Sequence, residues 1–258
     1  MRGPGGRLFS LGLGLVLLGV ASNAEASAWA MPKGQGQAIV KLEAIEASKA
    51  FDADGQSFDL LGGRRDGVVS LQVEYGLTDR LTLQAKGEYQ SGRDGAQDFN
   101  GRGPIEIGAR WQVYRDERNV VALYGGYSQS GDTRNAGYAE PGQGDHDTEI
   151  RLLAGRGGPR LFGEVQLARR WRDGLPDEMR LDVTAGWKIR PQWLLMGQAY
   201  LGRADARPDG GRSQWAVAEV SAVRHFGPWS GQAAWRATLA GTSTPVSYGP
   251  VLAIWRRF

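Results

Sequence analysis

A strict alternation of apolar and polar side chains runs through the stretch YGLTDRLTLQAKGEY, residues 75–89. Apolar residues occupy every second position on both sides of a tight polar hinge at 78–80, and glutamine, lysine and glutamate stand between them. Successive side chains of a strand point to opposite faces, so this hairpin has one apolar face and one charged face. Two folds offer such surroundings: a soluble β-sandwich, and a membrane barrel whose apolar face meets lipid.

The same period-two pattern recurs along the chain and predicts about twelve strands. Most of these segments are close to the roughly ten residues that a tilted strand needs to cross a bilayer. The predicted strands are 37–48, 68–77, 81–90, 105–114, 120–129, 148–155, 161–171, 178–188, 193–202, 214–226, 230–240 and 246–258.

The connections between these strands alternate in length. The short hinges fall at 78–80, 115–119, 156–160, 189–192 and 227–229. The long polar loops are predicted at 51–67, 91–104, 130–147 and 203–212, with shorter connections on the same side at 172–177 and 241–245. A sandwich gives no reason for this alternation, whereas outer-membrane barrels have short periplasmic turns and longer external loops.

We therefore predict an all-β fold, a transmembrane antiparallel up-and-down β-barrel of about twelve strands, with roughly ten or fourteen as alternatives. Such a barrel satisfies every backbone hydrogen-bonding group inside a bilayer. Its expected location is the outer membrane of a Gram-negative bacterium. An even number of strands then leaves both termini in the periplasm.

Aromatic residues gather near the ends of the predicted strands, around the short hinges and beside the long loops. Amphipathic rings favour the two membrane–water interfaces, where they form girdles around a barrel. The predicted membrane-interface aromatics are Tyr75, Tyr89, Trp111, Trp187, Trp193, Trp229 and Phe258.

The first residues are typical of a secretory signal peptide. A start that contains two arginines is followed by the apolar run 8–20 and then by small residues. The apolar run is shorter than the roughly 18–20 residues of a spanning helix. We predict a signal peptide over 1–26 and a barrel domain over 27–258, with a cut after Ala28 as the alternative.

Composition and motifs argue against several classes of function. The chain has no cysteine, so it has neither a disulfide framework nor a thiolate metal site. Its net charge of +3 gives no support to nucleic-acid binding. The two histidines, His146 and His225, fall at opposite ends of the predicted strands and cannot share a catalytic site. We predict no enzyme activity, no metal site and no cofactor; an Asp–His site at 145–147 is the weaker alternative.

The polar face of the predicted strands carries equal numbers of cations and anions. Charges that alternate on neighbouring strands pair and brace a wall, and balanced charge predicts a narrow, weakly selective or closed pore. Three tyrosines, Tyr114, Tyr124 and Tyr200, are predicted to add rings to the lumen that suit stacking on sugars or phenols. The predicted lumen-lining residues are Lys41, Glu43, Glu74, Lys86, Glu88, Glu106, Arg110, Arg151, Glu164, Arg170, Arg180, Asp182, Lys188 and Arg236, together with Glu149 and Glu219.

Three short stretches resemble a known family: AWAMPKGQGQ (28–37), AFDADG (50–55) and EYGLTDRLTLQ (74–84). The family comprises Gram-negative outer-membrane barrels, transporters of the phenol-degradation MetA type and exported XagA-like proteins of exopolysaccharide loci. The resemblance implies a barrel and no catalytic residues. Separately, the stretch 246–258, ending on Phe258, resembles the C-terminal strand that the barrel assembly machinery recognises.

The leading hypothesis is a narrow channel for small solutes. The alternatives are an accessory outer-membrane protein of exopolysaccharide export or surface adhesion, and a barrel with a structural role alone. The expected partners are outer-membrane lipid and lipopolysaccharide, the barrel assembly machinery, and a small solute or a polysaccharide.

Overall fold

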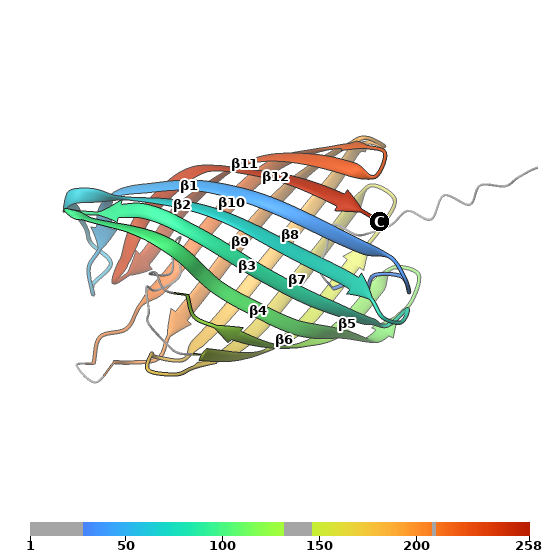
Figure 1. The fold of residues 1–258 in the computed structure, drawn as a ribbon, viewed down its shortest axis with the longest axis horizontal. Helices are drawn as coiled ribbons and strands as arrows, with labels where there is room; N and C mark the ends of the chain where they lie inside the picture. The colour runs from blue at the N-terminus through green and yellow to red at the C-terminus, as the bar shows by residue number, and fades with distance from the viewer. Residues whose placement is uncertain (1–27, 132–145, 208–209) are drawn as a thin grey trace, which may run out of the picture.

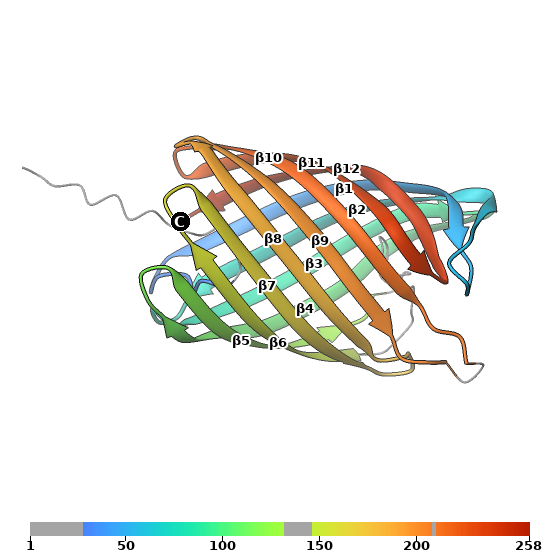
Figure 2. The same cartoon turned by 180° about the vertical axis from the view of Figure 1, so that it is seen from behind.

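Twelve antiparallel strands close into one barrel, as predicted, in a computed structural model that describes residues 28–131, 146–207 and 210–258 (Figures 1 and 2). Each strand pairs with its neighbours in sequence, and β1 pairs with β12 to close the sheet. The strands are β1 (Gly36–Phe51), β2 (Ser57–Gly76), β3 (Leu81–Asp94), β4 (Gln97–Arg115), β5 (Asn119–Gln129), β6 (His146–Gly157), β7 (Leu161–Arg172), β8 (Glu178–Arg190), β9 (Trp193–Ala204), β10 (Gln214–Phe226), β11 (Trp229–Thr242) and β12 (Thr244–Arg257).

The barrel has two distinct ends. At the terminal end, where β1 begins and β12 finishes, every connection between strands is a tight turn of two to four residues. The opposite end, here called the loop end, holds the remaining connections (Figure 1). The predicted signal peptide lies outside the described residues, as does most of the predicted loop 130–147. None of the described residues forms a helix long and apolar enough to cross a membrane.

Two of the predicted long loops are wrong. Residues 57–67 continue β2, and 91–94 and 97–104 continue β3 and β4, so that only 52–56 and 95–96 connect these strands. The backbone ladder persists where Arg64 pairs with Asp94. Backbone pairing needs no apolar face, and both faces of these extensions are rich in polar residues, so the side-chain alternation that reveals a strand is missing there.

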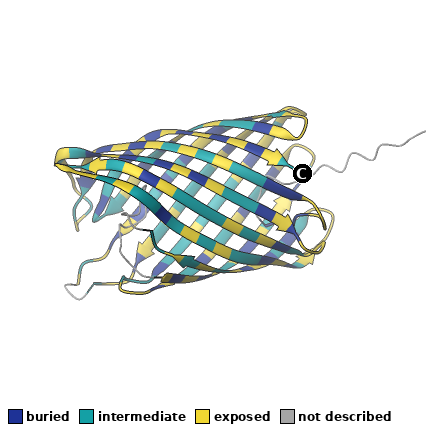
Figure 3. Cartoon of the chain, viewed as in Figure 1, coloured by how far each residue is buried: buried dark blue, intermediate teal, exposed yellow. Residues whose placement is uncertain are grey.

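Burial alternates along the strands (Figure 3). The exposed positions are largely apolar and face outward, and many of the buried ones are polar and face the lumen. In the hairpin of β2 and β3, Leu71 and Leu83 are exposed on the outer face. Glu74 and Thr82 are buried on the inner face. A core turned outward in this way suits a lipid surrounding.

The predicted interface aromatics all lie on the outer face, with exposed fractions from 39% for Trp229 to 57% for Phe258. The prediction that Tyr114 lines the lumen is wrong, because its side chain lies on the outer face and is 52% exposed. A register shift between Gln112 and Tyr114 inserts an extra residue, and this bulge reverses the inward–outward parity of the strand end.

The turn between β4 and β5 is organised by Asp116. Its carboxylate accepts hydrogen bonds from the Asn119 amide, from the backbone N–H groups of Arg118 and Asn119, and from the Tyr114 hydroxyl. These bonds, the Asn119 side chain first, hold the pKa of Asp116 below its ordinary value. The charged carboxylate therefore stabilises the turn.

We expect Asp116→Ala to lower the unfolding temperature of the barrel, measured by the heat-dependent shift in gel mobility. Glu117→Ala is the matched control, because no hydrogen bond is recorded for that neighbouring carboxylate. The folded pKa of Asp116 is depressed, so its contribution is complete above the unfolded pKa of about 3.9 and is lost as the pH falls further. Equal unfolding temperatures of the two variants at pH 7 would contradict this assignment.

Candidate functional site

The residues just before β1 turn into the barrel and lie in its lumen at the terminal end. Residues 28–31, here called the N-terminal segment, are buried. Four hydrogen bonds hold their backbone: Ala28 N–H to Glu164 Oε2 at 2.6 Å, Ala30 N–H to Gln112 Oε1 at 3.0 Å, Met31 N–H to Thr82 Oγ1 at 2.8 Å, and Arg110 Nη2–H to the Trp29 carbonyl at 3.1 Å. Side chains of β3, β4 and β7 thus fix the segment against the inner wall.

Trp29 anchors this segment by packing. Its ring lies over Gly155 of β6, where a Cβ atom would stand only 2.5 Å from the ring. Tyr124 is similarly placed, with its ring over Gly108 of the neighbouring strand β4 and over Gly126 of its own strand. Inward-facing glycines thus leave room for large rings inside a narrow barrel.

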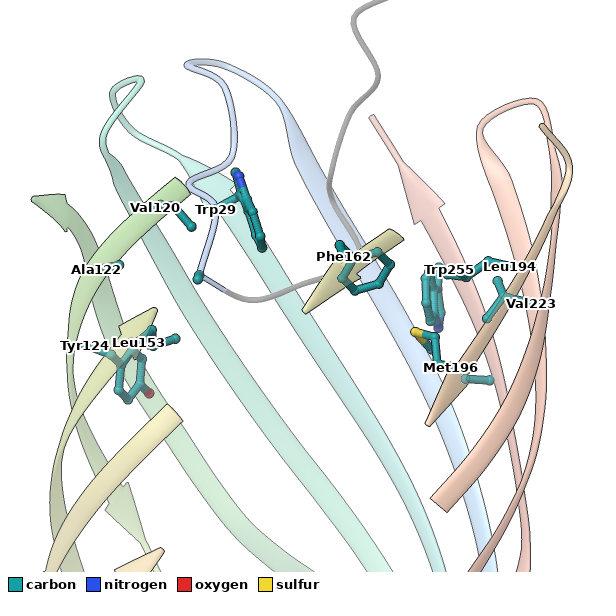
Figure 4. Close-up of a cluster of buried hydrophobic side chains, with 12 residues drawn as sticks. Trp29, Val120, Ala122, Tyr124, Leu153, Phe162, Leu194, Met196, Val223 and Trp255 are labelled. Carbon is teal, nitrogen blue, oxygen red and sulfur yellow. The ribbon is translucent and has the colours of Figure 1, made fainter. Parts of the chain in front are cut away.

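An apolar collar lines the lumen around Trp29 (Figure 4). Its members come from the N-terminal segment and from the terminal-end parts of β5, β6, β7, β9, β10 and β12, and the strand side chains point inward although they are apolar. The collar comprises Ala28, Trp29, Val120, Ala122, Tyr124, Leu153, Phe162, Leu194, Met196, Val223, Ala253 and Trp255. Strand parity predicts a lumen that is polar throughout, but at the terminal end the lumen is apolar.

A charge cluster on β4, β6, β7 and β8 lies nearer the loop end. Three arginines, Arg151, Arg170 and Arg180, contact the single carboxylate of Glu149, which is 5% exposed. Arg170 Nε donates to Glu149 at 2.8 Å. Glu106 adds a second carboxylate 3.4 Å from Arg151. We call these five residues the Glu149 cluster.

A second charge cluster, here called the Arg236 cluster, joins β1, β10 and β11 and comprises Lys41, Glu43, Glu219 and Arg236. Arg236 donates to Glu43 at 2.6 Å and to Glu219 at 2.9 Å, and its guanidinium lies 5.4 Å from the ring centre of Tyr200. Lys41 pairs with Glu43 along the same strand. Both clusters contain ion pairs that pass over an intervening strand, so they link parts of the wall that share no backbone hydrogen bonds.

The remaining predicted lumen residues belong to neither charge cluster and make separate contacts. Arg110 donates to Glu74 at 3.1 Å while it holds the Trp29 carbonyl, and Lys86 pairs with Glu88 at 2.5 Å. The other two complete the predicted set: Lys188 lies 6.0 Å from the ring centre of Phe162, and Asp182 is half-buried opposite Gln166.

Between the N-terminal segment and the Arg236 cluster lies a cavity of about 200 Å³. Trp29, Met31 and Trp255 form its apolar side, and Gln72, Gln198, Gln232 and Glu219 contribute to its polar side. The cavity shows that side chains do not fill the described lumen completely.

The two histidines lie at opposite ends of the barrel. His146 begins β6 at the loop end, where its ring stacks on Tyr127 with 5.9 Å between ring centres. His225 lies near the terminal end of β10, 2.8 Å from the Ser230 hydroxyl. No histidine is thus available to join the other in an acid–base pair.

Sequence reasoning missed both the N-terminal segment and the collar. The signal for the segment was the pair of large apolar residues, Trp29 and Met31, placed before the first alternating stretch. The signal for the collar was weaker: Val120, Leu153 and Leu194 each continue an apolar run that covers both faces of a strand end.

Comparisons with known proteins define the fold without giving a family. No protein-family model matches the chain, and no curated protein matches it. Solved structures do. The COG4313 outer membrane channel from Pseudomonas putida F1 is 17% identical, with a TM-score of 0.72 over 90% of this chain and 98% of that one.

Two further solved barrels are similar. The KdgM porin in complex with disordered oligogalacturonate is 8% identical, with a TM-score of 0.57 over 86% of this chain and 99% of that one. The translocator domain of autotransporter NalP from Neisseria meningitidis is 14% identical, with a TM-score of 0.57 over 88% and 90%. At these identities the likeness is one of fold, the outer-membrane β-barrel.

We expect Glu149→Gln to destabilise the barrel by about 3–5 kcal/mol, because it removes a buried carboxylate that three partly buried arginines share. Urea unfolding in detergent micelles measures the change. Glu46→Gln is the control: its carboxylate is half-exposed and 3.7 Å from Arg65, so we expect about 0–1 kcal/mol. Equal losses from both substitutions would show that the cluster contributes no special stability.

We also expect the N-terminal segment to be protected from water-borne reagents. A single cysteine can report this, because the chain has none. Met31→Cys should react slowly with a charged maleimide, and Lys33→Cys, at an exposed position, should react quickly. Adding Gly155→Leu should speed the reaction at position 31 by at least about tenfold, since the new side chain takes the space of Trp29. Equal rates at both positions in the otherwise unchanged chain would contradict the docking.

Proposed function

We propose that this protein is an outer-membrane channel for small solutes, narrowed at its terminal end by the N-terminal segment. The observation that carries the proposal is the content of the lumen. A closed barrel here encloses fixed charges and a cavity of about 200 Å³ that side chains leave unfilled, as a path for small solutes requires.

The segment suits the role of a constriction. It is held by four hydrogen bonds and by the packing of one large ring, with no strand pairing of its own. Hydrogen bonds contribute about 0.5–1.5 kcal/mol each, so displacing the segment costs far less than opening the barrel wall. The path through the lumen is then set by the segment, the collar and the two charge clusters.

Balanced charge favours weak ion selectivity. The Glu149 cluster holds three cations and two anions, and the Arg236 cluster holds two of each. Channels that select strongly by charge tend to present rings of one sign. Most of these charges are already paired, so a passing ion meets a weak net field.

The alternative is an accessory protein of exopolysaccharide export or surface adhesion. The extended, polar hairpins of β1 to β4 at the loop end favour it, since they add a long surface outside the apolar band. The XagA-like stretches of the sequence and the oligogalacturonate complex of the similar porin KdgM are consistent with a saccharide partner. The MetA-like resemblance favours the channel instead.

The cellular setting follows from the same proposal. The signal peptide is removed after Ala26, which leaves Ala28 and its bond to Glu164 in the mature chain. Both termini face the periplasm, lipid and lipopolysaccharide surround the outer face, and the barrel assembly machinery recognises the last strand.

Planar-bilayer recording tests the proposal. We expect a small unitary conductance from the purified protein, and a several-fold larger one when residues 28–31 are replaced by Gly-Ser-Gly-Ser. Arg180→Glu should shift the reversal potential toward cations, because it changes the sign of a lumen charge. Arg93→Glu, at an exposed position of the loop end, should leave it unchanged.

A different result favours the alternative. Absence of conductance in all of these variants, together with loss of surface polymer when the gene is deleted, would contradict the channel and support an accessory role.

A further inference from the structure

The two ends of the barrel differ in how many of their basic residues form ion pairs. At the loop end several arginines have acidic partners, among them Arg93 with Asp98 and Arg172 with Glu178, whereas Arg203 donates to the Met179 sulfur. At the terminal end, no ion pair is recorded among the described residues for a set here called the terminal rim, which comprises Lys33, Arg80, Arg115, Arg118, Arg156, Arg160, Arg190, Arg224 and Arg256.

The terminal rim is strongly positive. The described turns at this level carry three carboxylate side chains, Asp79, Asp116 and Glu117, against the nine cations of the rim, and Lys188 and Arg257 add two more cations at the strand ends. Asp116 is already engaged by its own turn. Concentrated charge of one sign raises the local density of anions and favours an anionic partner.

Two arginines of the rim are at the depth of the aromatic girdle. The guanidinium of Arg224 lies 5.6 Å from the ring centre of Trp193, and that of Arg256 lies 5.0 Å from the ring centre of Trp229. Both indoles face outward, and tryptophan marks the level of lipid headgroups. These cations therefore stand where phosphate groups of a bilayer lie.

An apolar groove runs across the outer wall next to Arg224. It crosses β7 to β11, has a volume of about 830 Å³, and is bordered by Trp187 and Trp235. Gly197 and Ala222 form part of its floor. Arg224 is two residues beyond Ala222 on the same face of β10, about 7 Å along the strand.

We propose that this groove and Arg224 bind a phospholipid with a net negative headgroup. One acyl chain of the lipid lies in the groove, and the phosphate of its headgroup pairs with the Arg224 guanidinium. The positive field of the terminal rim adds to this attraction. Charge complementarity and the adjoining apolar groove together fit an anionic lipid better than a soluble anion, which has no use for the groove. The inference is independent of solute passage through the lumen.

The groove supplies a clean test. A Cβ atom at Gly197 would meet nothing within 4 Å, so this position has room for a side chain, and Gly197→Leu places one in the groove. Gly125→Leu is the matched control, because Gly125 also has open space but lies on β5, away from the groove. For the charge, Arg224→Gln is compared with Arg65→Gln at the loop end, where the arginine already has Glu46 as partner.

Native mass spectrometry of the full-length barrel, titrated with phosphatidylglycerol or phosphatidylcholine, measures binding. We expect preference for phosphatidylglycerol, an affinity about fivefold lower in Arg224→Gln, and loss of the tightest site in Gly197→Leu. Both controls should match the unchanged protein.

Three results would overturn the proposal: equal binding of both lipids, unchanged binding in Arg224→Gln and Gly197→Leu, or displacement of phosphatidylglycerol by polygalacturonate or inorganic phosphate at similar concentrations. The last result would assign the rim to soluble anions. The conductance of Arg224→Gln and Gly197→Leu is measured as well. Unchanged conductance in both variants shows that a failure of the lipid proposal leaves the proposed channel function intact.

Discussion

The pairing of β1 with β12 is the constraint on which the rest of the structure depends. It removes both free edges of the sheet, so every strand can present an apolar outer face to lipid with its backbone groups satisfied. Closure also creates a narrow interior in which side chains from non-neighbouring strands come into contact. Its walls must be compatible with each other across the lumen as well as along the sheet, and the chain meets this demand with two different chemistries.

At the terminal end the interior is apolar and is completed by a piece of the chain that belongs to no strand. Nearer the loop end it is ionic, and arginines reach over neighbouring strands to carboxylates beyond them. Arg110 connects the two regions, since it is 1% exposed and holds both Glu74 and the Trp29 carbonyl. Moving the N-terminal segment would remove one hydrogen bond from this buried guanidinium, so the position of the segment is coupled to the charges in the lumen.

The sequence predicts the wall of this barrel better than its contents. Period-two alternation reports which side of a strand meets lipid, and the strand number and outward aromatics follow from it. The strand extensions around Arg64 and Asp94 are not predicted, because polar residues on both faces leave no alternation in the sequence. The bulge beside Tyr114 escapes because one inserted residue inverts parity without any composition signal. The N-terminal segment escapes because its partners, from Thr82 to Glu164, are set by three-dimensional closure alone.

The N-terminal segment also has a consequence for the order of assembly. It precedes β1, the strand whose pairing with β12 completes the ring, yet Ala28 contacts Glu164, which is 136 positions away on the far wall. The binding site for the segment is finished only after β7 has been added. The segment therefore docks after the strands that hold it have come together, although it precedes all of them in the chain.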